Sequence, residues 1–153
     1  MGSEQIYNFR KISDDVITGG HPTEANIRDV AAEGFRAVVN IAPVDGRSLP
    51  DEDRLVRSLG MAYHHIPVIW DAPTAADLAL FEEALDGLAG DRVLIHCAAN
   101  FRVTAFYSLY AQKKLGWSVE QARALRSSIW DGSDYPIWNT FISDTEHAIA
   151  SSG

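Results

Sequence analysis

The chain of 153 residues has a single cysteine, Cys97, and it lacks both a long hydrophobic run and a strongly basic segment. One cysteine excludes an internal disulfide and suits a reducing compartment, so we expect a cytoplasmic protein. No apolar stretch approaches the roughly 20 residues of a membrane helix, and the first residues lack the layout of a signal peptide. These absences predict that the protein has no membrane partner.

Basic residues are also few relative to acidic ones, and the net charge is −8. Without a basic run to neutralise phosphates, a nucleic-acid partner is not expected. Solubility alone explains such a charge, and an anionic substrate would need a local positive site. The chain is 46% hydrophobic and 22% charged, which is ordinary globular composition. We therefore predict one domain over residues 1–153, with its core at about 6–149.

Hydrophobic periodicity predicts an α/β fold in which strands and helices alternate from Val16 to Leu115. The predicted strands span 7–12, 16–18, 37–41, 62–68 and 92–95, and the first two form a hairpin. Predicted helices follow caps at Thr23, Thr74 and Ser118, and others span 51–59, 102–115 and 135–150. Such alternation favours a mostly parallel central sheet flanked by helices.

The most informative segment spans 93–104, where an apolar strand leads into His96, Cys97 and then a helix from Arg102. Ligands of parallel sheets bind at the carboxyl ends of strands, where Cys97 is expected. A helix N-terminus offers unpaired N–H groups and a positive dipole, which favour a thiolate and bind an anion. The planar Arg102 side chain suits two oxygens of phosphate or sulfate. Covalent catalysis on an anionic substrate is therefore predicted, with a buried structural cysteine and a helix-surface arginine as the alternatives.

His96, Cys97, Arg102 and, more loosely, Thr104 resemble the phosphate-binding loop of the cysteine-dependent protein tyrosine and dual-specificity phosphatases. Only the four residues from Ala98 to Phe101 separate Cys97 from Arg102, one fewer than in that family. Asn100 stands near the usual loop glycine, and asparagine tolerates the left-handed conformation better than most residues. The hydroxyl of Thr104 follows Arg102 by two positions instead of one.

Further segments at 18–23, 33–41, 63–68 and 70–74 are similar to a bacterial subfamily of dual-specificity-phosphatase-like proteins. That subfamily is related to a phosphatase-like domain found fused to metallo-β-lactamase-like hydrolases, and the resemblance extends from Ile6 to Phe141. It implies a cysteine-phosphatase fold and metal-free hydrolysis of phosphate monoesters through a phosphocysteine. The implied substrate is a phosphorylated protein or a small phosphate ester.

The resemblance also implies roles for the loop residues. His96 would orient the loop through hydrogen bonds, Asn100 would shape it, and its backbone N–H groups would contact the anion. Thr104 would hydrogen-bond the sulfur of Cys97, although a helical threonine bonds its own backbone as readily. The expected substrate-binding residues are His96, Ala98, Ala99, Asn100, Phe101, Val103 and Thr104.

Asp71 is the expected general acid, because it lies on a loop after a strand in the region where the family carries its acid. Trp70 and Pro73 would lower the polarity around this carboxyl and favour its protonated form. The alternative is an ordinary turn aspartate. Asp131, which follows Trp130, is a rival acid.

The shorter loop leaves two further functions open. The site would bind anions without turnover, or it would carry a persulfide on Cys97 as in the rhodanese sulfurtransferases, whose loop is also shorter. No metal or other cofactor is expected, because His21, His64 and His65 lack a second cysteine or a carboxylate at ligand spacing.

Overall fold

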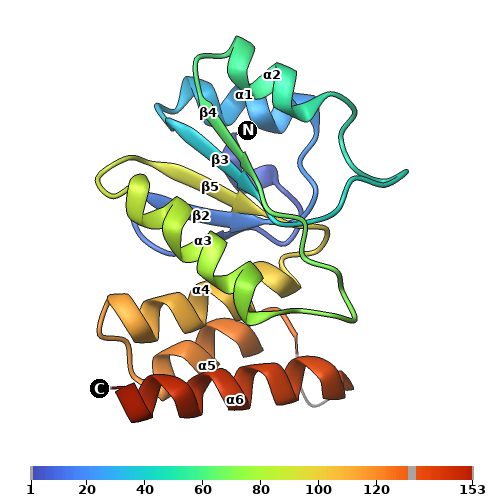
Figure 1. Cartoon of the computed structure of the whole chain (residues 1–153). Helices are drawn as coiled ribbons and strands as arrows, with labels where there is room; N and C mark the ends of the chain where they lie inside the picture. The colour runs from blue at the N-terminus through green and yellow to red at the C-terminus, as the bar shows by residue number, and fades with distance from the viewer. Residues whose placement is uncertain (1, 131–133, 153) are drawn as a thin grey trace.

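A five-stranded sheet with the order β1-β2-β5-β3-β4 forms the centre of the computed structural model, which describes residues 2–130 and 134–152 (Figure 1). The strands are β1 (Arg10–Lys11), β2 (Val16–Gly19), β3 (Ala37–Asn40), β4 (Ala62–His65) and β5 (Val93–His96). β1 and β2 pair antiparallel, and the other neighbours pair in parallel. The predicted α/β fold with a mostly parallel sheet is confirmed.

Helices cover both faces of this sheet. They are the 3-10 helix η1 (Ser3–Gln5), α1 (Glu24–Ala32), α2 (Glu52–Ser58), α3 (Ala75–Gly87), α4 (Phe101–Lys114), α5 (Val119–Ser127) and α6 (Pro136–Ser152). α1 and α2 lie on one side, whereas α3 and α4 lie on the other, with α5 and α6 packed against α4 (Figure 1). The predicted caps Thr23, Thr74 and Ser118 all accept a backbone N–H and form capping boxes. Within the described residues, no helix is both long and apolar enough to cross a bilayer.

The central strand β5 separates two apolar clusters, because successive side chains of a strand point to opposite faces. Val93, Ile95 and Cys97 belong to the cluster under α3 and α4. Leu94 belongs to the cluster under α1 and α2. His96 follows the same alternation, so its ring lies on the face of α1 and α2, opposite the sulfur of Cys97.

Two strands are shorter than predicted by three residues or more. β1 covers only Arg10–Lys11 of the predicted 7–12, because Asn8 has φ 52 and so interrupts the extended backbone. β4 ends at His65 and not at Val68, since Pro67 has no N–H for the ladder. The backbone N–H of Val68 still donates to the carbonyl of Ile41 at 3.0 Å, which keeps this segment beside the carboxyl end of β3.

Candidate active site

The turn between β5 and α4 depends on Asn100. Its backbone has φ 69 and ψ 7, so the expected left-handed conformation is confirmed, and α4 begins at the next residue. The buried side chain donates from Nδ2 to the carbonyl of Asn8 at 2.8 Å and to the Thr18 hydroxyl at 2.9 Å. These bonds fix the N-terminus of α4 against the start of the chain and against β2.

Several backbone N–H groups of this turn have no acceptor among the described residues. The N–H of Cys97 donates to the carbonyl of Gly19, and that of Thr104 donates to the carbonyl of Asn100. Between Cys97 and Thr104, other backbone N–H groups have no acceptor in residues 2–130 and 134–152. They include those of Ala98, Ala99, Phe101, Arg102 and Val103. A helix N-terminus with a preceding run of free N–H groups is a ready anion-binding site.

His21 and Asn8 bond the outer side of the loop, and Gly20 lets the backbone approach it closely. The N–H of His21 donates to the Ala98 carbonyl at 2.9 Å, and Asn8 Nδ2 donates to the Ala99 carbonyl at 3.0 Å. A Cβ on Gly20 would lie 2.6 Å from the Ala98 oxygen. This close approach therefore requires glycine at position 20.

Arg102 is a buried residue at the start of α4, with 8% of its surface exposed, so the helix-surface alternative is wrong. Its Nη1 donates to the carbonyl of Val68 at 2.8 Å, and its Cζ lies 5.6 Å from the centre of the Trp70 ring. Its Nε is buried and has no acceptor among the described residues. A guanidinium has five N–H donors, so this fixed side chain retains donors for an anion.

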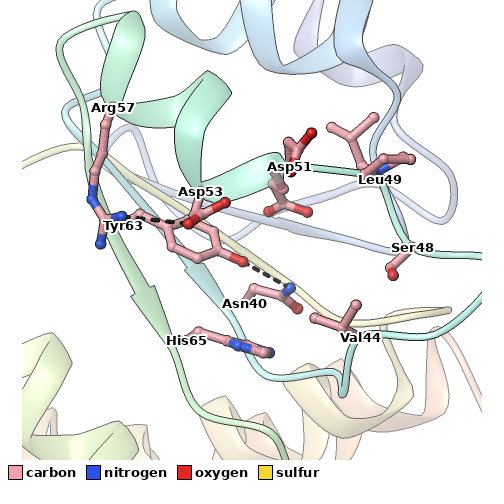
Figure 2. A pocket seen from close by; sticks show the side chains of 11 residues that line it. Asn40, Val44, Ser48, Leu49, Asp51, Asp53, Arg57, Tyr63 and His65 are labelled. Atoms are coloured by element: carbon pink, nitrogen blue, oxygen red, sulfur yellow. Dashed lines mark hydrogen bonds and ion pairs between the residues drawn. The ribbon is translucent and has the colours of Figure 1, made fainter.

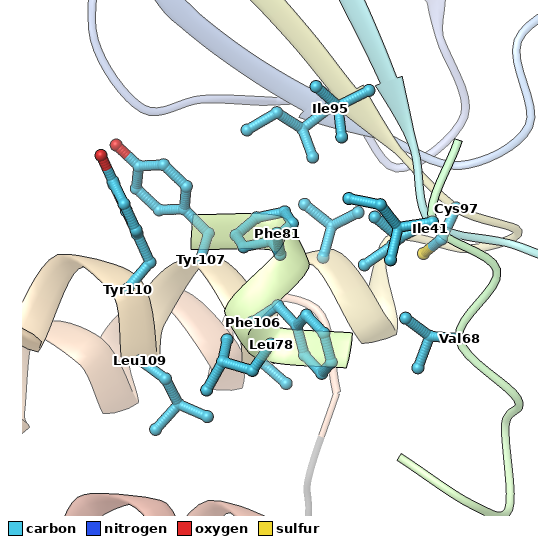
Figure 3. Packing of buried hydrophobic residues seen from close by; sticks show 14 of the residues in the cluster. Ile41, Val68, Leu78, Phe81, Ile95, Cys97, Phe106, Tyr107, Leu109 and Tyr110 are labelled. Carbon is cyan, nitrogen blue, oxygen red and sulfur yellow. The ribbon is translucent and has the colours of Figure 1, made fainter. Parts of the chain in front are cut away.

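Cys97 has no exposed surface. Figure 3 shows it beside Ile41 and Val68, at the edge of the apolar cluster under α3 and α4. The expected position at the carboxyl end of the central strand is confirmed. The alternative of a buried structural cysteine also stays open, because a substrate reaches this sulfur only if the side chains that cover it move.

Thr104 does not have the expected contact with the sulfur of Cys97. Its hydroxyl lies 2.9 Å from the carbonyl oxygen of Asn100 and 3.0 Å from that of Phe101, and it accepts from Trp130 Nε1 at 3.1 Å. Of the two expected partners, the backbone of its own helix is therefore confirmed and the sulfur is not, because a threonine in the first turn of a helix readily bonds the carbonyls that precede it.

Asp71 is exposed on the loop after β4, so the expected apolar cover from Trp70 and Pro73 is absent. The Trp70 carbonyl accepts from Trp138 Nε1 at 2.6 Å, which holds the residue before Asp71 against α6. Asp71 and Asp134 line one hollow of about 130 Å³, together with Trp70 and other aromatic residues. Sequence reasoning missed Asp134, whose only signal is its place before α6. The rival acid Asp131 lies outside the described residues.

His96 is fully buried on the other face of the sheet, and its partner there was not predicted. Its Nε2 lies 2.5 Å from Oε2 of Glu52, and its Nδ1 lies 3.3 Å from the carbonyl oxygen of Cys97. The ring of His21 is centred 6.4 Å away. Burial, and next the neighbouring His96, lower the pKa of His21 below its usual value. No sequence signal distinguishes Glu52 from the acidic residues on either side of it.

A polar hollow of about 420 Å³ lies beside the edge strand β4, and Glu52 is part of its wall. Figure 2 shows Asn40, Tyr63 and His65 facing one another there, with Asn40 donating to the Tyr63 hydroxyl at 3.1 Å. Cys97 is not among the residues that line it. In the described part of the chain, no group of three His, Cys, Asp or Glu side chains is placed to hold a metal ion.

Residues 8–123 match the family model described as Beta-lactamase hydrolase-like protein, phosphatase-like domain. The chain belongs to this family. Beta-lactamase hydrolase-like proteins of Xylella fastidiosa and Agrobacterium fabrum are 31% and 28% identical over 103 and 104 residues. These matches cover 64% and 65% of this chain but only 23% and 24% of the relatives, so the chain corresponds to about a quarter of their length.

Solved structures agree with this family. The DUF442 protein of Shewanella putrefaciens CN-32 is 30% identical, with a TM-score of 0.87 over 96% of this chain and 97% of that one. Tk-PTP in its active form has a TM-score of 0.76 at 21% identity, covering 92% and 97% of the two chains. TpbA of P. aeruginosa, solved in complex with pTyr, has a TM-score of 0.72 at 16% identity, covering 94% and 90%. The predicted resemblance is confirmed: this is a phosphatase-like domain with the protein tyrosine phosphatase fold.

Proposed function

We propose that this domain hydrolyses phosphate monoesters through a phosphocysteine formed on Cys97. One observation carries the proposal. At the end of the central strand, backbone N–H groups that have no acceptor in residues 2–130 and 134–152, together with the buried guanidinium of Arg102, lie within six residues of a cysteine. Membership of a phosphatase-like family supports the same reaction class.

In the first step, the thiolate of Cys97 attacks phosphorus, so a P–S bond forms while the P–O bond to the leaving group breaks. The loop N–H groups and Arg102 hold the non-bridging oxygens and stabilise their charge in the transition state. Asp71 gives its proton to the leaving oxygen. In the second step, water attacks phosphorus and the P–S bond breaks. Asp71 takes the proton from the water, and phosphate and the thiolate are released.

The proposed substrates are a phosphorylated protein or a small phosphate ester, with no metal involved. One structural neighbour was solved with pTyr, and this supports the general class of phosphate ester without identifying the physiological substrate. A single cysteine in an active thiolate role also fits a reducing cytoplasm, the proposed location.

The complete burial of Cys97 favours one second candidate, an anion-binding domain without turnover. In that case the N–H groups and Arg102 bind phosphate or sulfate, while the sulfur stays covered. Phosphate binding alone does not separate the two candidates, whereas turnover does.

Hydrolysis of para-nitrophenyl phosphate, measured from mildly acidic to neutral pH, tests the proposal. We expect turnover by the wild type, none by Cys97→Ser, and a slower, less pH-dependent rate for Asp71→Ala. Full activity in Cys97→Ser would exclude the phosphocysteine. A folded wild type that binds phosphate in equilibrium dialysis but shows no turnover would establish the second candidate.

A further inference from the structure

Glu52 and His96 form a buried pair that joins α2 to the catalytic loop. Glu52 is 5% exposed and His96 is fully buried, and 2.5 Å separates Oε2 from Nε2. Glu52 Oε1 is also buried and has no partner among the described residues. Within the described part of the chain, the hydrogen-bond partner of this carboxyl group is therefore the histidine that directly precedes the proposed nucleophile.

The contacts of His96 determine which of its ring nitrogens carry protons. The carbonyl oxygen of Cys97 is an acceptor only, so the 3.3 Å contact requires a proton on Nδ1 of His96. Nε2 then either donates a second proton to the Glu52 carboxylate or accepts one from the protonated carboxyl. Both arrangements fix the plane of the ring and keep Nδ1–H directed at the carbonyl of Cys97.

The position of that carbonyl decides where the next N–H points, because the two belong to one planar peptide group. The carbonyl of Cys97 and the N–H of Ala98 share this plane, and the N–H of Ala98 is among those with no acceptor in the described residues. A ring that rotates away from Cys97 therefore frees the peptide that carries the first N–H of the proposed anion site.

We propose that Glu52 is a positioning residue, which holds His96 so that its Nδ1–H fixes the Cys97–Ala98 peptide in the anion-binding orientation. The inference rests on the proposed function for the kinetic effect, whereas the effect on the sulfur and on the loop does not require turnover. Glu52 touches neither the sulfur nor the substrate, and it acts through the His96 ring from the opposite face of the sheet.

Glu82 provides a matched control. It is also a buried glutamate, 9% exposed, but it lies on α3 and pairs with Lys113 at 2.9 Å. Loss of the Glu52 carboxylate leaves the buried His96 ring without this partner, whereas the side chain of Lys113 is about half exposed and reaches water. Of these two glutamates, Glu52 contacts His96 beside the loop and Glu82 contacts Lys113. Loss of Glu52, and not of Glu82, should therefore change the chemistry of Cys97.

The test compares Glu52→Ala and Glu52→Gln with Glu82→Ala and Glu82→Gln. The first readout is alkylation of Cys97 by iodoacetamide, with and without inorganic phosphate. The second is kcat and KM for para-nitrophenyl phosphate. The third is the exchange of the His96 Nδ1–H proton in ¹⁵N-labelled protein, assigned by its loss in His96→Asn.

We expect Glu52→Ala to weaken the protection of Cys97 by phosphate and to lower kcat/KM by about 100-fold, as a displacement of about 1 Å can. Glutamine can donate to Nε2 and keep Nδ1–H in place, so Glu52→Gln should recover most of both losses and keep the slowly exchanging proton. The Glu82 variants should match the wild type in all three readouts. If Glu52→Ala does not fold, the exchange readout on the wild type remains decisive, because rapid exchange of Nδ1–H there overturns the proposal.

The proposal is also overturned if folded Glu52→Ala keeps wild-type protection by phosphate and wild-type exchange at His96. Failure of the phosphatase reaction gives a different result. In that case the wild type has no turnover, yet phosphate protection and Nδ1–H exchange still depend on Glu52.

Discussion

Arg102 Nη1 donates to the carbonyl oxygen of Val68 at 2.8 Å, which fixes the start of α4 to the segment that follows β4. The N–H of Val68 in turn donates to the carbonyl of Ile41, at the carboxyl end of β3. The guanidinium is thereby held over the end of the sheet before any ligand binds. Such preorganised donors stabilise a developing charge more effectively than mobile ones.

Arg102→Lys should lower both the phosphate affinity and kcat, because lysine cannot keep the bond to Val68 while also contacting two oxygens. Loss of one such donor typically costs about 100-fold or more in kcat. Steady-state kinetics and equilibrium dialysis with phosphate measure the two effects. Arg126→Lys is the control, since Arg126 bonds Ser108 and Glu146 on other helices and should affect stability alone.

Asn100→Ala should destabilise the protein more than Asn100→Gly. Both variants lose the bonds to Asn8 and Thr18, but only alanine also carries the steric cost of φ 69. That cost is about 1–2 kcal/mol for a residue with a Cβ in the left-handed region. Urea unfolding gives the two free energies of unfolding. An alanine variant as stable as the glycine variant would show that the turn has relaxed to another conformation.

Gly20→Ala should weaken phosphate binding, because its Cβ would lie 2.6 Å from the Ala98 carbonyl oxygen and so displace the loop. Gly46→Ala is the matched control, since a Cβ there meets nothing within 4 Å. Phosphate affinity by equilibrium dialysis should fall for the first variant and stay unchanged for the second. Equal affinities would mean that the loop tolerates displacement at Ala98.

Two tyrosines, the partly buried Tyr63 and the buried Tyr107, predict a loss of stability at alkaline pH. Burial, and next the charge of Glu52, raises the pKa of Tyr63 to about 12, and burial raises the pKa of Tyr107 to about 12. The unfolded chain releases these protons near pH 10, so the folded state binds more protons between about 10 and 12. The free energy of unfolding should therefore fall as pH rises through this range.

Tyr63→Phe removes one of these groups and should flatten that decline, although it also loses the bond from Asn40. Urea unfolding at several alkaline pH values, for the wild type and Tyr63→Phe, measures the slopes. Identical slopes would show that Tyr63 titrates alike in the folded and unfolded chains.

Local signals in the sequence were enough for much of the fold. Thr23, Thr74 and Ser118 cap helices because a hydroxyl and a side chain three residues later satisfy N–H groups nearby. The left-handed conformation of Asn100 was likewise predictable, because asparagine tolerates it better than most residues.

The features that the sequence did not predict depend on contacts between distant segments. Glu52 meets His96 only after α2 packs on the sheet, and Cys97 shares its apolar cluster with Ile41 and Val68 from other segments. The Thr104 hydroxyl bonds the carbonyls of Asn100 and Phe101 at the start of its own helix instead of the sulfur of Cys97. Asn8 shortened the first strand through a backbone conformation that its residue type permits but does not require.

The most direct test of the central claim is the mass of the peptide containing Cys97 after acid quenching during hydrolysis of para-nitrophenyl phosphate. A phosphocysteine predicts that this peptide gains the mass of one phosphoryl group in the wild type and not in Cys97→Ser. Sustained hydrolysis by the wild type with no phosphoryl group on this peptide, together with undiminished hydrolysis by Cys97→Ser, would contradict it.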